Sequence, residues 1–226
     1  MRDRLHSLPF AGAGLLLALW MLTMSQHSAS QHGQHASPRP PGAPIAMPVD
    51  RADDSYAIYA LLMPGQPFAS LPAEQNQHWA IAEVTVNESD RNPAIPPQGQ
   101  LKPPPENPRG FNEAVGDYET NKNARVRLEK APLHIDHDFT LLSPAEVNAL
   151  REARSGPQTS SQEQSQWAGF PGVTYFSEVY FNPEHTSALV YMNDWCAHLC
   201  AAGTWIYLEK HGGHWVRRSG IVTGGG

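Results

Sequence analysis

The C-terminal third of the chain constrains the fold most, because it holds four β-rich runs joined by very short connections. The runs are VTYFSEVYFN (173–182), SALVYMNDWC (187–196), TWIYLEK (204–210) and HWVRRSG (214–220). Connections this short join neighbouring strands as hairpins, so consecutive runs pair in antiparallel fashion. The sequence therefore predicts a C-terminal antiparallel β-meander of about four strands.

Helical signals precede these strands. Tyr56 and Tyr59 stand at helical spacing in a segment that has acidic residues in its first turn and ends at Pro64-Gly65. Ser143 and Glu146 form a capping-box pattern around a proline at the first helical position. With helices first and strands last, we expect an α+β fold whose N-terminal helices pack on the C-terminal meander.

The start of the chain predicts export. Arg2 and Arg4 precede an apolar run, residues 8–24, and the small residues Ser28-Ala29-Ser30 follow it. A basic start, an apolar stretch and small residues are the parts of a signal peptide, which we place at residues 1–30. The apolar run is shorter than the ~20 residues that a membrane span needs. We expect a periplasmic or secreted protein without a membrane span after cleavage; the alternative is a membrane tether formed by an uncleaved signal-anchor.

Two proline-rich stretches indicate the domain organisation, one before the folded domain and one within it. Residues 31–49 are rich in proline and histidine and predict a disordered linker. Residues 50–226 then form a single α+β domain. Within it, residues 92–109 predict a surface loop, because proline cannot supply the hydrogen bonds of a sheet.

Charge and motifs exclude several function classes. The formal net charge of −6 gives the protein no electrostatic reason to bind nucleic acid. The chain has no phosphate-binding loop, no dinucleotide fingerprint and no His-Glu-x-x-His motif. The sequence therefore predicts no particular reaction and no cofactor.

The two cysteines, Cys196 and Cys200, are followed by His211 and His214. In an exported protein two nearby thiols oxidise, so we expect a Cys196–Cys200 disulfide. A zinc site is the alternative, because Cys-x3-Cys followed by His-x2-His approaches a zinc-finger spacing. A redox-active pair and free thiols also remain open.

A second cluster, HIDHD, holds His134, Asp136, His137 and Asp138. In a strand, His134, Asp136 and Asp138 would share one face, where they could chelate a cation or simply form a polar edge. Together with His211 and His214, this cluster would make the chain an envelope metalloprotein or hydrolase. Such a site requires the side chains to converge in one concave pocket.

Aromatic residues are frequent in the predicted strands. We interpret them chiefly as core residues and cross-strand pairs, although a surface strip of them could bind a glycan or a peptide. The set is Trp79, Trp167, Tyr175, Phe176, Tyr180, Phe181, Tyr191, Trp195, Trp205, Tyr207 and Trp215.

The C-terminal third also resembles a known family. Its pattern is matched by Ser177, Val179, Phe181-Asn182, Ala188-Leu189-Val190-Tyr191, Cys196, Leu199-Cys200, Gly203, Leu208-Glu209-Lys210, Gly213 and Trp215. These residues resemble a family of predicted exported bacterial proteins that has no established function. The resemblance supports the fold and the pairing of the cysteines, and it implies no activity.

The sequence thus favours an exported cell-envelope protein that acts as a non-enzymatic binding or structural domain. Its partner would be an envelope ligand, a peptide or a glycan. The metalloprotein or hydrolase, with zinc as its cofactor, is the alternative.

Overall fold

The computed structural model describes residues 42–63, 78–155, 166–167, 169–196 and 201–218. The chain divides into two units, residues 1–39 and 40–226, and every described residue belongs to the second. The predicted signal peptide, residues 1–30, and most of the predicted linker therefore lie outside the described residues. Regular secondary structure begins at β1 (Ile45–Ala46), within the segment that the sequence assigns to the linker.

The predicted helices form α1 (Val49–Leu62) and α4 (Pro144–Ser155). The predicted capping box of α4 is present: the Ser143 amide donates to Glu146 Oε2 at 2.8 Å, and the Glu146 amide donates to Ser143 Oγ at 3.3 Å. A third long helix, α3 (Pro108–Asn121), begins where the Asn107 side chain accepts a hydrogen bond from the Gly110 amide at 3.1 Å. Side-chain oxygens thus satisfy amides at the start of both helices.

The proline-rich segment 92–109 is held against the sheet. It follows the short helix η2 (Glu88–Asp90) and contains α2 (Pro97–Gln100). Trp205 Nε1 donates to the Ile95 carbonyl at 2.8 Å, and the Trp205 amide donates to Gln100 Oε1 at 2.9 Å. Leu101 is buried. These contacts make the segment part of the packed structure.

Seven strands form the main sheet, and two short strands, β1 and β3 (Val126–Arg127), pair separately. The seven are β2 (Trp79–Ala82), β4 (Phe139–Leu142), β5 (Val173–Phe176), β6 (Tyr180–Phe181), β7 (Ser187–Trp195), β8 (Ala201–His211) and β9 (His214–Arg217). Their order is β4-β2-β5-β7-β8-β9, and β6 also pairs with β7. β2 runs parallel to β4 and β5, whereas β5, β7, β8 and β9 pair in antiparallel fashion.

The prediction of a four-stranded antiparallel meander was therefore wrong, although the α+β class is correct. The four C-terminal runs do pair with one another, but the sheet continues past β5 into β2 and β4. These two strands join in parallel, through β–α–β connections whose partners lie far apart in the sequence. Nothing in the local sequence of β2 or β4 indicates which strand will lie beside it.

A break separates β5 from β6, although both strands lie along the same neighbour, β7. Ser177 bridges the break: its amide donates to the Tyr191 carbonyl, and its Oγ accepts from the Tyr191 amide, both at 2.8 Å. The break carries Glu178 into the protein interior, where its side chain is 4% exposed. An acidic residue is therefore buried in the middle of the sheet.

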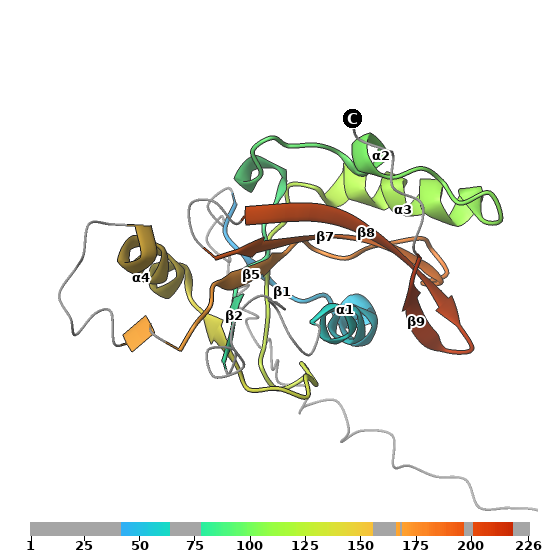
Figure 1. Cartoon of the computed structure of the whole chain (residues 1–226). Coiled ribbons are helices and arrows are strands. Elements are labelled where there is room, and N and C mark those ends of the chain that lie inside the picture. The colour runs from blue at the N-terminus through green and yellow to red at the C-terminus, as the bar shows by residue number, and fades with distance from the viewer. Residues whose placement is uncertain (1–41, 64–77, 156–165, 168, 197–200, 219–226) are drawn as a thin grey trace, which may run out of the picture. The chain divides into compact units, whose positions relative to one another are not determined.

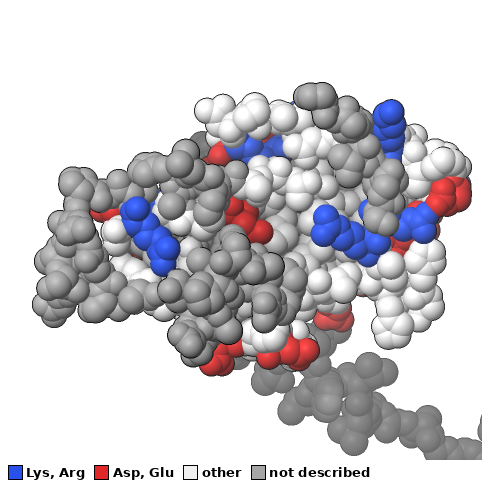
Figure 2. All heavy atoms as spheres, in the orientation of Figure 1, with Lys and Arg blue, Asp and Glu red and all other residues white. Residues whose placement is uncertain are grey.

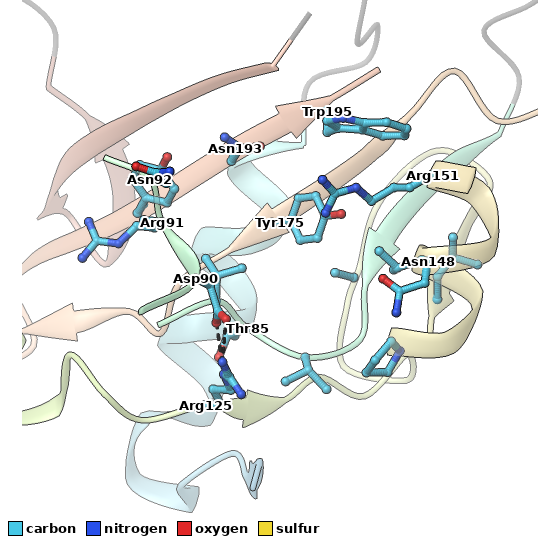
Figure 3. Close-up of a pocket in the computed structure, with 17 residues that line it drawn as sticks. Thr85, Asp90, Arg91, Asn92, Arg125, Asn148, Arg151, Tyr175, Asn193 and Trp195 are labelled. Carbon is cyan, nitrogen blue, oxygen red and sulfur yellow. Dashed lines mark hydrogen bonds and ion pairs between the residues drawn. The ribbon is translucent and has the colours of Figure 1, made fainter. Parts of the chain in front are cut away.

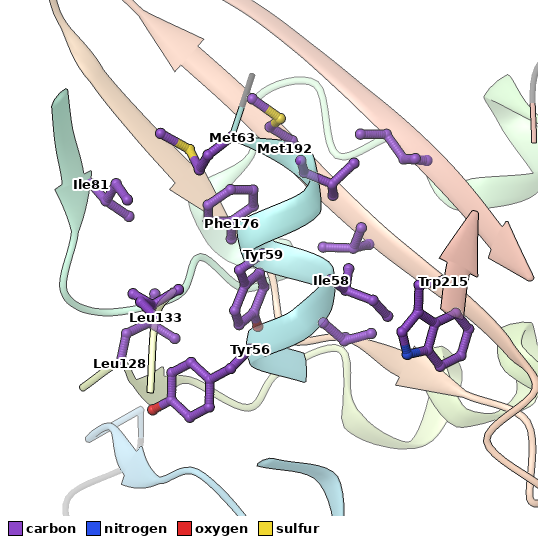
Figure 4. Packing of buried hydrophobic residues seen from close by; sticks show 14 of the residues in the cluster. Tyr56, Ile58, Tyr59, Met63, Ile81, Leu128, Leu133, Phe176, Met192 and Trp215 are labelled. Atoms are coloured by element: carbon purple, nitrogen blue, oxygen red, sulfur yellow. The ribbon is translucent and has the colours of Figure 1, made fainter. Parts of the chain in front are cut away.

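Helix α1 covers one face of this sheet (Figure 1). Ile58 and Tyr59 of this helix are fully buried, and the centre of the Tyr59 ring lies 4.8 Å from the centre of the Phe176 ring. Figure 4 shows these side chains around α1, with Trp215 of β9 on the far side of the helix. Burial of this apolar cluster makes the α1 face the main core of the domain.

Two helices cover the opposite face at separate places (Figure 1). Helix α3 packs on β6, β7 and β8 through Phe111 and Tyr118, both fully buried. Helix α4 packs near β2 and β4 through Val147 and Leu150. These two apolar clusters do not merge, so part of the sheet face lies between them without a helix over it.

We expect Gly110→Ala to destabilise the fold by about 1–3 kcal/mol, because a methyl group has no room there. A Cβ on Gly110 would lie 2.4 Å from the hydroxyl of Ser187, a fully buried residue. A Cβ on Gly116, on the same helix, would meet no atom within 4 Å, so Gly116→Ala should stabilise α3 by about 0.5–1 kcal/mol. Urea unfolding of both variants checks the prediction, and shifts of the same sign would contradict it.

Candidate functional site

Three of the four candidate zinc ligands, Cys196, His211 and His214, lie among the described residues. Cys196 is buried just after β7, and Cys200 lies outside the described residues. His211 and His214 are exposed and face each other across the β8–β9 turn. Trp195 pairs with Ala201 at the far end of β8, ten residues before His211, which is on the order of 30 Å along a strand. Cys196 thus lies far from the two histidines, and because Cys200 is outside the described residues, both the Cys196–Cys200 disulfide and the alternative zinc site stay predictions.

The HIDHD cluster is a bend before β4 rather than a strand, and His134, Asp136, His137 and Asp138 are all exposed. Asp53 of α1 and His134 line a hollow of about 250 Å³. Among the described residues, no group of three or more His, Cys, Asp or Glu side chains is arranged to hold a metal ion.

The two clusters also lie apart from each other. HIDHD precedes β4, whereas His211 ends β8 and His214 begins β9, and β4 and β9 are the two ends of the sheet order. Four to five strand spacings of about 4.8 Å separate the two clusters, on the order of 20 Å. Among the described residues the two clusters therefore do not converge in one pocket, and the metalloprotein or hydrolase alternative stays a prediction.

A larger cavity, of about 520 Å³, opens where the sheet face is not covered by a helix. Its floor includes Tyr175 of β5 together with Asn193 and Trp195 of β7 (Figure 3). Tyr191 of β7 also lines the cavity. Alternate residues of a strand point to the same face, and Tyr175 pairs directly with Asn193. The strand register therefore brings these four side chains together.

The two sides of the cavity come from distant parts of the chain. Val147, Asn148 and Arg151 of α4 form one side. The segment from Val84 to Asn92, together with Arg125, forms the other (Figure 3). The cavity therefore exists only in the assembled domain.

Gly203 of β8 allows one floor side chain to lie flat on the sheet. A Cβ at this position would come within 1.8 Å of the Tyr191 hydroxyl and 2.9 Å of Asn193 Nδ2. The missing side chain leaves room for the Tyr191 ring over the β8 backbone. Glycine at this position therefore helps to shape the cavity floor.

Three arginines line the cavity, and two of them are already engaged. Arg125 Nε donates to Asp90 Oδ2 at 3.0 Å. Arg91 donates to the Ile95 carbonyl at 2.9 Å and to the Tyr118 hydroxyl at 3.1 Å, and its guanidinium lies 5.0 Å from the Trp205 ring centre. These two side chains mainly hold the segment around residue 91 against the sheet.

Arg151 is the third arginine and differs from the other two. Its guanidinium lies 5.3 Å from the centre of the Trp195 ring, a cation–π contact, and it forms no ion pair with the described residues. The side chain extends from α4 over the cavity floor toward Tyr175 (Figure 3). An unpaired, oriented guanidinium is suited to bind an anion.

The Tyr175 hydroxyl, next to Arg151, is buried and has no hydrogen-bond partner among the described residues. Burial raises the pKa of Tyr175, and the positive charge of Arg151, together with its contact to the hydroxyl oxygen, offsets part of the rise. The hydroxyl therefore keeps its proton at neutral pH, and this proton can still be donated to a ligand because a guanidinium donates hydrogen bonds and does not accept them. A buried donor without a partner costs free energy, which a ligand oxygen would recover.

The remaining polar groups of the cavity include one carboxylate, one hydroxyl and three side-chain amides. Asp90 is the one carboxylate of the lining and is paired with Arg125, while the Thr85 hydroxyl accepts the Val126 amide at 2.8 Å. The side-chain amides that line the cavity belong to Asn92, Asn148 and Asn193. This lining supplies donors and amides, with no paired nucleophile and base of the kind that covalent catalysis uses.

Sequence reasoning placed Tyr175, Tyr191 and Trp195 among the strand aromatics but did not single out Asn148, Asn193 or Arg151. The alternation of Tyr191, Asn193 and Trp195 was the available signal, since these positions share a strand face. No sequence pattern indicated that Arg151, on a helix, would reach them.

Charged groups are scattered on the face shown in Figure 2, where lysine and arginine form small separate groups among neutral surface. In the part of the chain that the structure describes, no helix is both long and apolar enough to cross a membrane.

A search of protein-family models finds no match for the chain, and comparisons with curated proteins and with solved structures find none either. The family resemblance of the C-terminal third therefore stays a prediction.

Proposed function

We propose that this chain is an exported cell-envelope protein whose folded domain binds a ligand in the cavity beside α4 and performs no chemistry on it. The single observation that carries the proposal is the cavity of about 520 Å³, which joins an aromatic floor to an arginine without an ion pair and a buried hydroxyl without a geometric hydrogen-bond partner among the residues that the structure describes. Concave sites of this size that combine apolar surface with a few polar groups are typical of ligand binding.

Export is supported by the start of the sequence. The basic residues Arg2 and Arg4, the apolar run at 8–24 and the small residues at 28–30 follow the order of a signal peptide. The ligand would then be an envelope component, a peptide or a glycan. Nucleic acid remains an unsuitable partner for a chain with a net charge of −6.

We expect Asn148→Trp to abolish ligand binding, because an indole at this exposed position of α4 would fill the cavity from its side. The ligand source is a small-molecule extract of bacterial envelopes, and binding is followed by amide NMR shifts of the full folded domain. In the wild type we expect shifts at Tyr175, Asn193 and Trp195.

Ala149→Trp is the matched control, because Ala149 is exposed on the same helix and does not line the cavity. This variant should retain the shifts. An extract that shifts no cavity amide, or that shifts them equally in Asn148→Trp, would overturn the proposed function. Cell fractionation with N-terminal sequencing checks export separately, by showing whether residues 1–30 are removed.

A further inference from the structure

We propose that the cavity binds an acidic saccharide, with its carboxylate held between Arg151 and Tyr175 and its hydroxyl groups held by asparagine amides. This inference rests on the proposed function and names the class of its ligand.

The carboxylate position follows from Arg151 and Tyr175. Arg151 presents a guanidinium that the Trp195 ring orients and that no carboxylate of the described residues neutralises. The hydroxyl of Tyr175 lies beside it, buried, and no acceptor among the described residues takes its proton. A planar carboxylate accepts from both donors at once, which gives charge-assisted hydrogen bonds in a partly desolvated site.

The hydroxyl preference follows from the amides. Asn92, Asn148 and Asn193 surround the same cavity. A side-chain amide both donates and accepts hydrogen bonds, and so does a sugar hydroxyl, so the two match without leaving a polar atom unpaired. A purely apolar acid would displace water from these amides without replacing its hydrogen bonds, and the amides would then add nothing to its affinity.

The aromatic floor and the volume of the cavity also suit a saccharide. Tyr175, Tyr191 and Trp195 offer apolar ring surface for the C–H groups of a pyranose ring. A volume of about 520 Å³ is within the range that encloses a molecule of one or two sugar rings. The aromatic strip, the amides and the free guanidinium thus select one ligand chemistry together.

Digalacturonate is the test ligand, and neutral digalactose is its uncharged counterpart. Calorimetric titration of the full chain should give binding of digalacturonate at least about tenfold tighter than of digalactose, since one charge-assisted contact accounts for a factor of this size. Arg151→Gln should remove this preference. Tyr175→Phe should weaken digalacturonate binding about threefold to tenfold and leave digalactose binding unchanged.

Arg109→Gln is the control for net charge, because Arg109 is 80% exposed on α3 and does not line the cavity. It should keep the wild-type preference for digalacturonate. Equal binding of the acidic and neutral sugars would overturn the inference, as would a preference that survives Arg151→Gln.

A dipeptide with a free C-terminal carboxylate, Gly-Gly, distinguishes the other source of a carboxylate. Tighter binding of this dipeptide than of digalacturonate would overturn the saccharide assignment. If the envelope extract shifts the cavity amides while digalacturonate does not bind, the inference fails and the proposed function stands. If neither binds in the cavity, both fail.

Discussion

Replacing Arg51 by alanine should lower the free energy of unfolding by about 3–5 kcal/mol at pH 8, the largest effect that we expect from any single exposed or half-buried charge in this protein. Arg51, on α1, contacts two acidic side chains, Asp117 of α3 and Glu178 in the sheet. Its Nη1 lies 3.1 Å from Glu178 Oε1, and its Nη2 donates to the Val179 carbonyl at 2.9 Å.

The cost is large because the arginine serves partners that are removed from water. The side chains of Arg51, Asp117 and Glu178 are 13%, 22% and 4% exposed. Without the guanidinium, two carboxylates would be left facing each other across a poorly solvated space. Breaking a buried pair from one side costs far more than the pair contributes when it is intact.

Urea unfolding at pH 8 measures the effect. Arg109→Ala is the matched control, since its ion pair with Glu113 is on the surface, where solvent screens it, and its loss should hardly change the free energy of unfolding. At pH 5 the cost of Arg51→Ala should be smaller, because Glu178 is then protonated and no longer needs a cation. A cost below about 1 kcal/mol at pH 8 would contradict the role of Arg51.

The second large effect concerns pH: we expect Glu178 to make the protein less stable as the pH rises from about 4.5 to about 7. Burial raises the pKa of Glu178 to about 7, against an ordinary value of 4.5, and the nearby Asp117 carboxylate adds to the rise while Arg51 opposes it. One oxygen, Oε2, is buried without a hydrogen-bond partner among the described residues.

The sign follows from proton binding. Between pH 4.5 and pH 7 the folded state keeps a proton on Glu178 that the unfolded state has released, so raising the pH favours the unfolded state. The contribution of Glu178 is complete below pH 4.5 and is lost as the pH passes about 7. The total change is on the order of 3 kcal/mol.

Glu178→Gln isolates this contribution, because glutamine resembles the protonated acid in shape and cannot ionise. The variant should match the wild type near pH 4.5 and be more stable than it at pH 8, by on the order of 3 kcal/mol. Taking the difference between the two proteins cancels the pH dependence that other titratable groups contribute. Asp54 is one such group: burial alone would raise its pKa, but hydrogen bonds from Lys210 and Trp215 and the charge of Lys210 lower it. Two stability curves that run parallel from pH 4.5 to pH 8 would exclude Glu178 as the source.

A double-mutant cycle of Arg51→Ala and Glu178→Gln tests the energetic coupling between Arg51 and Glu178. If Arg51 stabilises the fold by neutralising Glu178, then Arg51→Ala should cost less in the Glu178→Gln background than in the wild type at pH 8. Equal costs in both backgrounds would assign the role of Arg51 to Asp117 alone.

Local features of the sequence were sufficient to predict helices α1 and α4. The capping box of Ser143 and Glu146 lies within one turn, and α4 begins where this pattern places it, at Pro144. The C-terminal β-rich runs became strands for a similar reason, since β8 and β9 are joined by the two glycines at 212–213. Signals that act over a few residues are visible without the fold.

The seven-stranded order, by contrast, could not be predicted. β2 lies between β4 and β5, which begin 60 and 94 residues after it, and these pairings are parallel. Parallel neighbours need a long connection and no particular turn, so the sequence around them carries no pairing signal. Only the assembled sheet decides which strands meet.

By itself, then, the sequence determined the mixed α+β class, the positions of α1 and α4 and the strand character of the last third, because each depends on contacts between near neighbours. The tertiary structure decided the rest. It separated Cys196 from His211 and His214 along one hairpin, brought Arg51 to Glu178 across 127 residues, and placed Arg151 of α4 over the aromatic floor of β5 and β7. Electrostatic pairing and cavity formation depend on which surfaces pack together, and that is a property of the whole chain.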